Sequence, residues 1–173
     1  MNKKLPLPIL VVLSMAVFDS CKFTNKVESP KYERMLERRL PINTPYILVS
    51  EVDDEKQANT VFLDTREREE YEVSHIENAL FVGYKDIDLS EVLKLPKDTS
   101  IIVYCSVGYR SGKVTKDLLD EGYTNVLNLY GGIFEWSNQQ KTLVDMNGQV
   151  TQNIHPYNER WGKWLTNGVK SYK

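Results

Sequence analysis

Residues 100–112, with the sequence SIIVYCSVGYRSG, constrain the fold more than any other part of this chain. Residues 101–104 form an unbroken apolar run with β-branched side chains, which is typical of a central strand covered on both faces. Residues 111–122 are amphipathic, and one side of this segment carries Val114, Leu118 and Leu119. The stretch therefore predicts a strand, a six-residue loop and a helix, with Cys105 at the first loop position.

This arrangement favours a reactive thiol at Cys105. A loop wrapped around a helix N-terminus directs several backbone N–H groups at one point, and the helix dipole adds partial positive charge there. Gly108 permits a tight turn, and Arg110 is the only full positive charge of the loop. These features lower the pKa of a thiol, and the thiolate is the nucleophilic form. A lone cysteine at a strand end is more often structural, but the glycine and arginine at these offsets favour catalysis.

Three further segments accompany this loop in order along the chain. They are VFLDTR at 61–66 with Glu-Tyr at 70–71, HIENA at 75–79, and LYGGIFEW at 129–136. Together with CSVGYRS at 105–111, they resemble the signatures of the rhodanese (sulfurtransferase) family in its single-domain form. Glu77 and Asn78 stand where the family commonly has Pro-Gly, which alters a surface turn and leaves the chemistry untouched.

The predicted fold class is α/β. Strands are expected near 46–49, 60–63, 80–82, 101–104 and 125–129, and helices near 50–57, 66–73, 90–95, 111–122 and 133–139. This alternation predicts a parallel sheet with helices on both faces, and the loop after residue 104 then lies at a carboxyl strand end. The resemblance implies a rhodanese-like domain whose sheet is five-stranded and mainly parallel.

The resemblance also implies sulfurtransferase activity with Cys105 as the catalytic nucleophile. Its thiolate attacks the sulfane sulfur of thiosulfate or a persulfide donor, and a thiol or cyanide acceptor then removes that sulfur from a Cys105 persulfide. Arg110 is expected to orient the loop or attract an anionic donor, and Tyr109 to shape the pocket mouth. Backbone N–H groups of the loop are expected to stabilise the persulfide, so the predicted substrate-binding residues are Ser106, Val107, Gly108, Tyr109, Arg110 and Ser111.

Three upstream residues are predicted to support the site structurally. Asp64 and Arg66 are typical of an ion pair that fixes neighbouring loops, and His75 is expected to hydrogen-bond to backbone, since an ionised thiolate needs no general base. The glycine pair at 131–132 is expected to permit close backbone approach beside the loop. No cofactor is expected, and two distant histidines without a metal-binding motif predict no metal site.

Two other functions stay open at this point. Phosphatases and arsenate reductases of related fold hold a tetrahedral oxyanion in a loop with six positions from cysteine to arginine. Cys105 to Arg110 spans five, and this smaller cradle suits a single sulfur atom better. The other alternative is a non-enzymatic rhodanese-like module that binds a partner or senses sulfur through Cys105.

The N-terminal residues predict export and lipid attachment. Two lysines precede an apolar run at 5–18, which is typical of a bacterial secretory signal. Ser20 and Cys21 at the end of this run resemble the lipobox of bacterial lipoproteins, and an ordinary secretory peptide or an uncleaved anchor is the alternative. We therefore expect a signal peptide at 1–20, a tether at 21–44, the rhodanese-like domain at 45–140 and a C-terminal extension at 141–173.

Cysteine usage and charge fit a protein exported to the bacterial cell envelope. Acylation of Cys21 leaves Cys105 as the sole thiol, which avoids a disulfide in an oxidising compartment. Lys22 stands where aspartate would resemble an inner-membrane retention signal, so an outer-membrane or periplasm-facing lipid anchor is expected. With 22 Lys and Arg against 24 Asp and Glu, no nucleic-acid partner is expected. The expected partners are the membrane, the small-molecule sulfur donor and the acceptor.

The C-terminal extension carries one patterned segment. Trp161, Trp164 and Leu165 have the i, i+3, i+4 spacing of one apolar helix face. This face either docks onto the domain or forms a partner or dimer surface, and the sequence leaves both possibilities open.

Lipid attachment can be tested on Cys21 alone. We expect labelled fatty acid to enter the wild-type protein in a bacterial host and to be absent from Cys21→Ser, because serine offers no thiol to the lipid-transfer reaction. Gel fluorography of the purified protein measures this incorporation. A wild-type protein without label would refute the lipid anchor.

Overall fold

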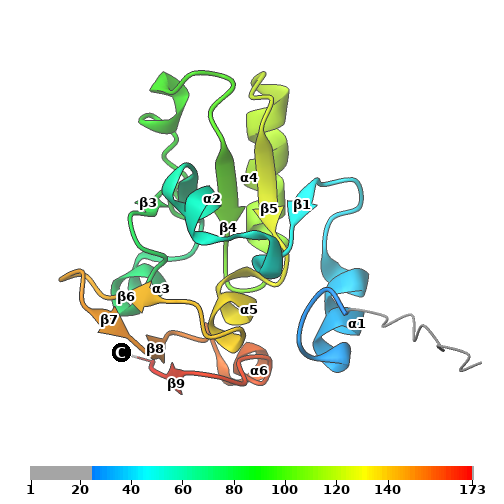
Figure 1. Cartoon of the computed structure of the whole chain (residues 1–173), viewed down its shortest axis with the longest axis vertical. Coiled ribbons are helices and arrows are strands. Elements are labelled where there is room, and N and C mark those ends of the chain that lie inside the picture. The colour runs from blue at the N-terminus through cyan, green and yellow to red at the C-terminus, as the bar shows by residue number, and fades with distance from the viewer. Residues whose placement is uncertain (1–24, 173) are drawn as a thin grey trace, which may run out of the picture.

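A computed structural model describes residues 25–172 of this chain. Its central sheet has five strands in the order β1-β5-β4-β2-β3 (Figure 1). All pairings within this sheet are parallel, so the carboxyl ends of the strands lie at one edge. The predicted α/β fold with a five-stranded parallel sheet is therefore confirmed. The strands are β1 (Tyr46–Ile47), β2 (Val61–Asp64), β3 (Leu80–Phe81), β4 (Ile101–Tyr104) and β5 (Val126–Leu129).

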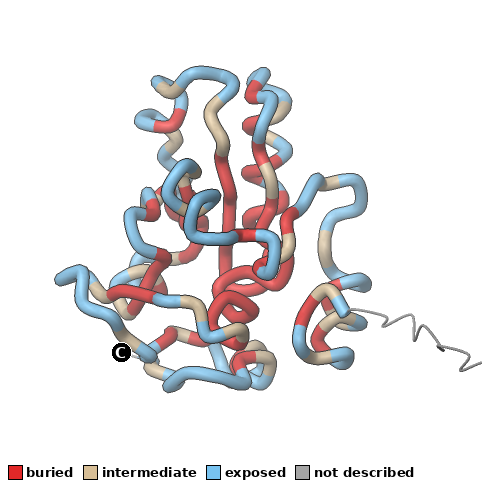
Figure 2. Tube along the Cα trace, in the orientation of Figure 1, coloured by how far each residue is buried: buried red, intermediate tan, exposed pale blue. Residues whose placement is uncertain are grey.

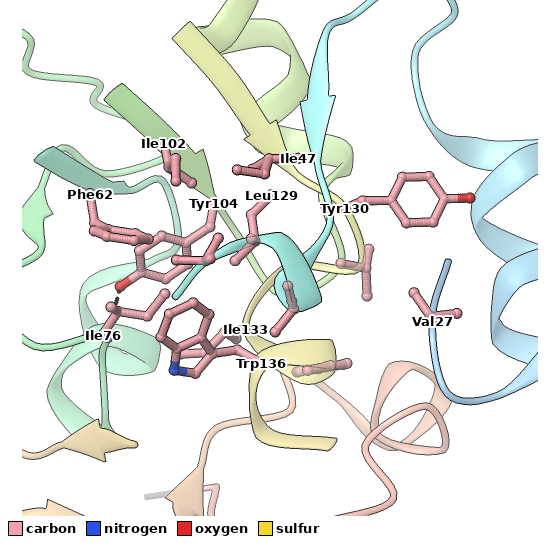
Figure 3. Packing of buried hydrophobic residues seen from close by; sticks show 14 of the residues in the cluster. Val27, Ile47, Phe62, Ile76, Ile102, Tyr104, Leu129, Tyr130, Ile133 and Trp136 are labelled. Carbon is pink, nitrogen blue, oxygen red and sulfur yellow. Dashed lines mark hydrogen bonds between the residues drawn. The ribbon is translucent and has the colours of Figure 1, made fainter. Parts of the chain in front are cut away.

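The central strand β4 is buried along its whole length (Figure 2). Its alternate side chains enter two separate apolar cores, as the two-residue period of a strand requires. Ile101 and Val103 join the core under α4 (Tyr109–Asp120). Ile102 and Tyr104 join the core that contains residues of α5 (Gly132–Asn138), shown in Figure 3. Helices therefore cover both faces of the sheet, as predicted.

Two predicted helices are shorter than the sequence pattern indicates. The segment expected near 50–57 is split into a 3₁₀ turn, η1 (Val49–Glu51), and α2 (Asp54–Ala58). The split follows from capping, because the Asp53 side chain accepts a hydrogen bond from the Lys56 N–H at 2.8 Å. The segment expected near 90–95 forms only the 3₁₀ turn η2 (Val92–Lys94). Between β2 and β3, the chain forms the helix α3 (Arg68–Val73).

In place of the expected tether, the described part of the segment before residue 45 packs on the domain. It contains α1 (Pro30–Arg39), whose Tyr32 and Leu36, one turn apart, are fully buried. The Tyr32 hydroxyl donates to the Gly131 carbonyl at 2.7 Å, and the Glu28 N–H donates to the Glu135 carboxylate at 2.8 Å. This amphipathic helix therefore covers α5 near the glycine pair.

The C-terminal extension also docks on its own domain. Leu143, Ile154 and Leu165 are buried in the same core as Tyr104, and the Asn138 side chain donates to the Trp164 carbonyl at 3.1 Å. Docking onto the domain is therefore the alternative that the structure shows. The extension comprises β6 (Leu143–Val144), β7 (Val150–Thr151), β8 (Asn153–Ile154), α6 (Glu159–Gly162) and β9 (Val169–Lys170).

Within residues 25–172, none of the helices is both long and apolar enough to cross a bilayer. The predicted signal peptide at 1–20 and the predicted lipidation residue Cys21 lie outside the described residues.

The glycine pair allows α5 to begin directly against the loop that follows β4. The Ile133 N–H donates to the Cys105 carbonyl at 2.9 Å, and the Phe134 N–H donates to the Ser106 carbonyl at 3.2 Å. Gly132 has φ +58°, and a Cβ there would overlap the Cys105 carbonyl oxygen and lie 2.7 Å from the Val107 nitrogen. The close approach expected of this pair is present.

Substitution of Gly132 tests this packing. We expect Gly132→Ala to destabilise the protein, because the positive φ alone is worth about 1–3 kcal/mol and backbone atoms that meet the new Cβ cannot rotate away. Gly122→Ala is the matched control, since Gly122 also has a positive φ, of +88°, but nothing within 4 Å of the new Cβ. Urea unfolding midpoints measure the difference, and equal midpoints for the two variants would contradict the packing argument.

Candidate active site

The loop between β4 and α4 lies at the carboxyl edge of the sheet, where the sequence places it. Gly108 is the N-cap of α4 and has φ +98°, which glycine adopts without strain. The helix therefore begins at Tyr109, two residues earlier than predicted, and Arg110 lies in its first turn. This earlier start turns the helix N-terminus and the Arg110 side chain toward the beginning of the loop.

The Cys105 thiol is buried at the base of this loop, with 1% of the residue exposed. The Gly108 N–H donates to Sγ at 3.1 Å. Burial by itself raises the pKa of the thiol, but the charge of Arg110 and hydrogen bonds from Ser111 and Val107 outweigh it. The pKa of Cys105 is therefore lowered below its ordinary value, which favours the thiolate.

A buried asparagine from the neighbouring strand holds the loop in place. The Asn128 side chain, on β5, donates to the Gly108 carbonyl at 2.8 Å and accepts from the Ser111 hydroxyl at 2.7 Å. Both ends of the turn are thus fixed to the sheet. The backbone N–H groups near Cys105 therefore have a defined direction before any ligand enters.

Arg110 is paired with Glu70 of α3. Its two terminal nitrogens donate to the two carboxylate oxygens of Glu70 at 2.7 and 2.8 Å, and one of them also donates to the Ser106 hydroxyl. Ser106 in turn donates to Glu70 at 2.7 Å. Burial raises the pKa of Glu70, but Arg110, Arg66 and Ser106 lower it more, so the carboxyl is ionised. This geometry supports the loop-orienting role expected of Arg110.

A pocket of about 170 Å³ opens onto this loop. Ser106, Val107, Tyr109 and Arg110 line it beside Cys105, whereas Gly108 and Ser111 contact the sulfur rather than the pocket. The guanidinium carbon of Arg110 lies 5.1 Å from the Tyr84 ring centre and 5.2 Å from that of Tyr157. The remaining lining residues come from outside the loop and are Tyr84, Tyr157 and Trp161.

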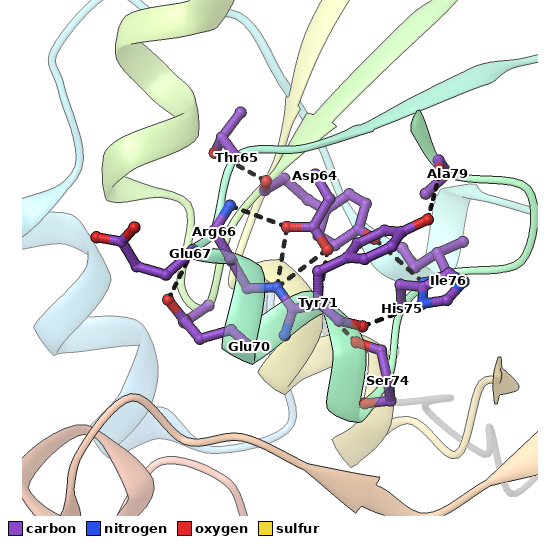
Figure 4. A network of polar contacts seen from close by, with 12 residues as sticks. Asp64, Thr65, Arg66, Glu67, Glu70, Tyr71, Ser74, His75, Ile76 and Ala79 are labelled. Atoms are coloured by element: carbon purple, nitrogen blue, oxygen red, sulfur yellow. Dashed lines mark hydrogen bonds and ion pairs between the residues drawn. The ribbon is translucent and has the colours of Figure 1, made fainter. Parts of the chain in front are cut away.

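Asp64 and Arg66 form a fully buried ion pair that does not line the pocket (Figure 4). One terminal nitrogen of Arg66 donates to Asp64 at 2.6 Å and to the Ser74 carbonyl at 2.6 Å. Burial lowers the pKa of Arg66, but Asp64 raises it more, so the guanidinium is charged. The pair joins the end of β2 to the turn after α3, a geometry consistent with the predicted supporting role.

His75 also lies away from the pocket. Its Nδ1 is 3.1 Å from the Tyr71 carbonyl oxygen, and its ring stacks on the Tyr71 ring with centres 4.0 Å apart (Figure 4). Its backbone N–H and carbonyl both pair with Val144 of the extension. His75 therefore contacts backbone on both sides, and its supporting role stays a prediction.

Sequence reasoning did not place Glu70, Tyr84, Tyr157 or Trp161 in the site. Glu70 lies among other acidic residues of a short helix, and only burial distinguishes it from exposed Glu69. Tyr157 and Trp161 are more than 50 residues from Cys105, and only the docking of the extension brings them to the pocket. Within residues 25–172, no group of three His, Cys, Asp or Glu side chains is arranged to hold a metal ion.

Comparison with known proteins points to one family. The family model described as "Rhodanese-like domain" matches residues 45–139, which is more than half of the chain. A relative named tRNA uridine(34) hydroxylase, from Pectobacterium carotovorum, is 39% identical over 116 residues, covering 64% of this chain and 32% of that protein. The chain thus spans about a third of the length of this curated relative.

Two solved structures resemble the fold. A thiosulfate sulfurtransferase from Pseudomonas aeruginosa aligns with a TM-score of 0.53 and 27% identity, over 70% of this chain and 23% of that chain. The BH2092 protein from Bacillus halodurans aligns with a TM-score of 0.51 and 20% identity, over 68% of this chain and 86% of that chain. The second likeness concerns the fold alone.

The acidity of the thiol is a direct test of this geometry. In the Cys21→Ser protein, where Cys105 is the only thiol, we expect the alkylation rate to rise with pH about a midpoint below the unperturbed value of about 8.5. Arg110→Met should move this midpoint upward, because it removes the positive charge that lowers the pKa and leaves the burial that raises it. A wild-type midpoint at or above the unperturbed value, or no shift in Arg110→Met, would contradict this assignment.

Proposed function

Because the chain belongs to the rhodanese-like domain family, we propose that it is a sulfurtransferase that works through a persulfide on Cys105. The observation that carries this proposal is the thiol itself. The thiol is buried at the base of a small pocket, and its Sγ accepts a hydrogen bond from the Gly108 N–H at 3.1 Å. The nearby charge of Arg110 helps to lower its pKa. A nucleophile with these surroundings suits attack on a sulfur atom that enters the pocket.

Transfer takes place in two displacements. In the first, the Cys105 thiolate attacks the sulfane sulfur of thiosulfate or a persulfide donor, and the bond from that sulfur to the leaving group breaks with its electron pair on the leaving group. In the second, cyanide or the thiolate form of a thiol acceptor attacks the outer sulfur, the S–S bond to Cys105 breaks, and the Cys105 sulfur leaves with the electron pair as the thiolate. Each step exchanges one bond to sulfur for another, so no oxidant, metal or general base is needed.

The loop supplies the electrostatic part of the reaction. The outer sulfur of a Cys105 persulfide carries negative charge, and it would lie close to the backbone N–H groups that already face Sγ. Such preorganised donors stabilise developing charge without rearranging during the reaction. Glu70 and Asn128 act through the loop, because they hold Arg110 and Gly108 and do not face the sulfur.

The name of the curated relatives does not add a second activity to this proposal. The hydroxylase activity in their name belongs to proteins that are much longer, and 68% of the length of the Pectobacterium protein lies outside the match. The thiosulfate sulfurtransferase from Pseudomonas aeruginosa has sulfur transfer in its name and shares the fold, over 23% of its own length. The five-position spacing of Cys105 and Arg110 continues to disfavour a phosphatase or arsenate reductase.

We also propose that the enzyme is held at the bacterial cell envelope by a lipid on Cys21. The support is the sequence pattern of residues 1–21, together with the position of α1. This helix begins nine residues after Cys21 and packs on the domain, so a lipid there would keep the active site near the membrane surface. The proposed partners are accordingly the membrane, a small sulfur donor and its acceptor.

A matched pair of cysteine substitutions tests the persulfide. We expect wild-type protein treated with a sulfane-sulfur donor to gain the mass of one sulfur atom, and Cys105→Ser to gain nothing, because a serine oxygen cannot carry a persulfide. Cys21→Ser is the control and should gain the sulfur as the wild type does. Intact mass spectrometry before and after cyanide measures both displacements. Persulfide-dependent thiocyanate formation by Cys105→Ser would overturn the proposal.

A further inference from the structure

Arg110, the cationic residue of the loop that lines the pocket, is already held by other groups of the protein. Its terminal nitrogens donate to Glu70 and to Ser106 at 2.7 to 2.8 Å, and its side chain is 11% exposed. The rings of Tyr84 and Tyr157 lie 5.1 and 5.2 Å from the guanidinium carbon, so the group is partly covered by aromatic carbon. Three of its five N–H hydrogens are therefore used by Glu70 and Ser106.

The buried Glu70 carboxylate also neutralises this charge. Its side chain is 1% exposed and accepts from both terminal nitrogens of Arg110, so the two groups together carry no net charge. A dianion such as thiosulfate loses its hydration shell when it enters the pocket. The Arg110 cation that it meets there is already paired with Glu70. Removing water from a charged group without such compensation is strongly unfavourable.

The rest of the pocket presents aromatic and apolar surface. Tyr84, Tyr109 and Tyr157 are 40 to 55% exposed, although large apolar side chains are usually buried, and Trp161 and Val107 complete this lining. The volume is about 170 Å³. A cavity of about 150 Å³ lined by apolar side chains accommodates benzene, so this pocket has room for one aromatic ring or a short alkyl group beside the sulfur.

We propose that this site selects sulfur donors whose sulfane sulfur is carried by an apolar or aromatic organic group, in preference to the small inorganic dianion thiosulfate. The inference rests on the proposed function, since it names the substrate class of the same site. The organic group would lie against Tyr157 and Trp161 while the sulfane sulfur reaches Cys105.

The C-terminal extension supplies this specificity. Tyr157 and Trp161 both belong to it, and they lie on either side of Asn158, whose side chain accepts from the Trp161 N–H at 3.1 Å as the N-cap of α6. The extension is itself anchored, because the Asn138 side chain accepts from the Thr166 N–H at 2.8 Å. Trp161 is thus held by a contact within the extension, and Tyr157 also faces Arg110 of the loop.

Organic thiosulfonates, R–SO₂–S⁻, make this selectivity measurable. The Cys105 thiolate attacks the terminal sulfur, the S–S bond breaks, and the sulfinate R–SO₂⁻ leaves with the electron pair. One Cys105 persulfide and one sulfinate form, and the total charge is unchanged. Methanethiosulfonate and benzenethiosulfonate carry the same charge and the same reacting sulfur, so they differ in the organic group.

The experiment compares kcat/KM for thiosulfate, methanethiosulfonate and benzenethiosulfonate with cyanide as acceptor, using the full chain. We expect the wild type to prefer the phenyl donor over the methyl donor and over thiosulfate by at least about tenfold, the discrimination that an apolar pocket provides between such groups. Because benzenesulfinate is also a better leaving group, the preference is compared between variants rather than taken from the wild type alone.

Two variants remove the aromatic wall. Trp161→Ala and Tyr157→Ala should each lower the phenyl-to-methyl ratio about threefold or more, since each removes part of the surface that covers the ring. Tyr157 is 47% exposed, so its removal keeps the test available if Trp161→Ala does not fold. Trp164→Ala is the matched control, because Trp164 belongs to the same extension, stacks on Tyr32, and does not line this pocket. It should keep the wild-type ratio.

Each outcome decides the inference separately from the sulfurtransferase proposal. A wild type that uses thiosulfate as well as benzenethiosulfonate would overturn the selectivity while leaving the Cys105 persulfide intact. A phenyl-to-methyl ratio that is the same in the wild type, Trp161→Ala and Tyr157→Ala would also overturn the selectivity. If intact mass shows no persulfide on Cys105 with any of the three donors, the proposed function fails and the inference fails with it.

Discussion

The paired hydrogen bonds between Glu70 and Arg110 are the interaction on which the rest of the site depends. They join α3 to the first turn of α4 and fix the orientation of the loop that carries Cys105. The pair is almost completely buried, so removing one partner would leave an uncompensated charge in the interior, which typically costs about 3–5 kcal/mol. Arg110 lowers the pKa of the thiol by its charge, and Glu70 balances that charge within the buried pair.

The remaining supports converge on this loop from other elements. Asn128 on β5 holds Gly108, and N–H groups in the first turn of α5 donate to carbonyl groups of the loop. A side chain at Gly132 would overlap the loop backbone there. Asn128 and α5 bind carbonyl groups of the loop, whereas Glu70 and Asn128 also bind the side chains of Arg110 and Ser111.

Two of the aromatic side chains that line the pocket come from outside the minimal domain. The family match covers residues 45–139, whereas Tyr157 and Trp161 belong to the extension and α1 precedes the match. A rhodanese-like domain is thus enclosed on two sides by parts of its own chain that are not shared with the family model. Since Tyr157 and Trp161 line the pocket without belonging to the matched domain, the C-terminal extension is the natural place for selectivity.

The sequence by itself determined the sheet, the loop and the nucleophile, because each is a local pattern. An apolar run, a cysteine and a glycine followed by an amphipathic helix specify a strand, a turn and a helix N-terminus through backbone preferences that act over a few residues. The tertiary structure alone decided that Glu70 pairs with Arg110, 40 residues away, and that Tyr157 and Trp161 reach the pocket. The folding of the expected tether into α1 belongs with these, because such contacts depend on burial between distant segments, and burial has no local signature in a run of acidic or aromatic residues.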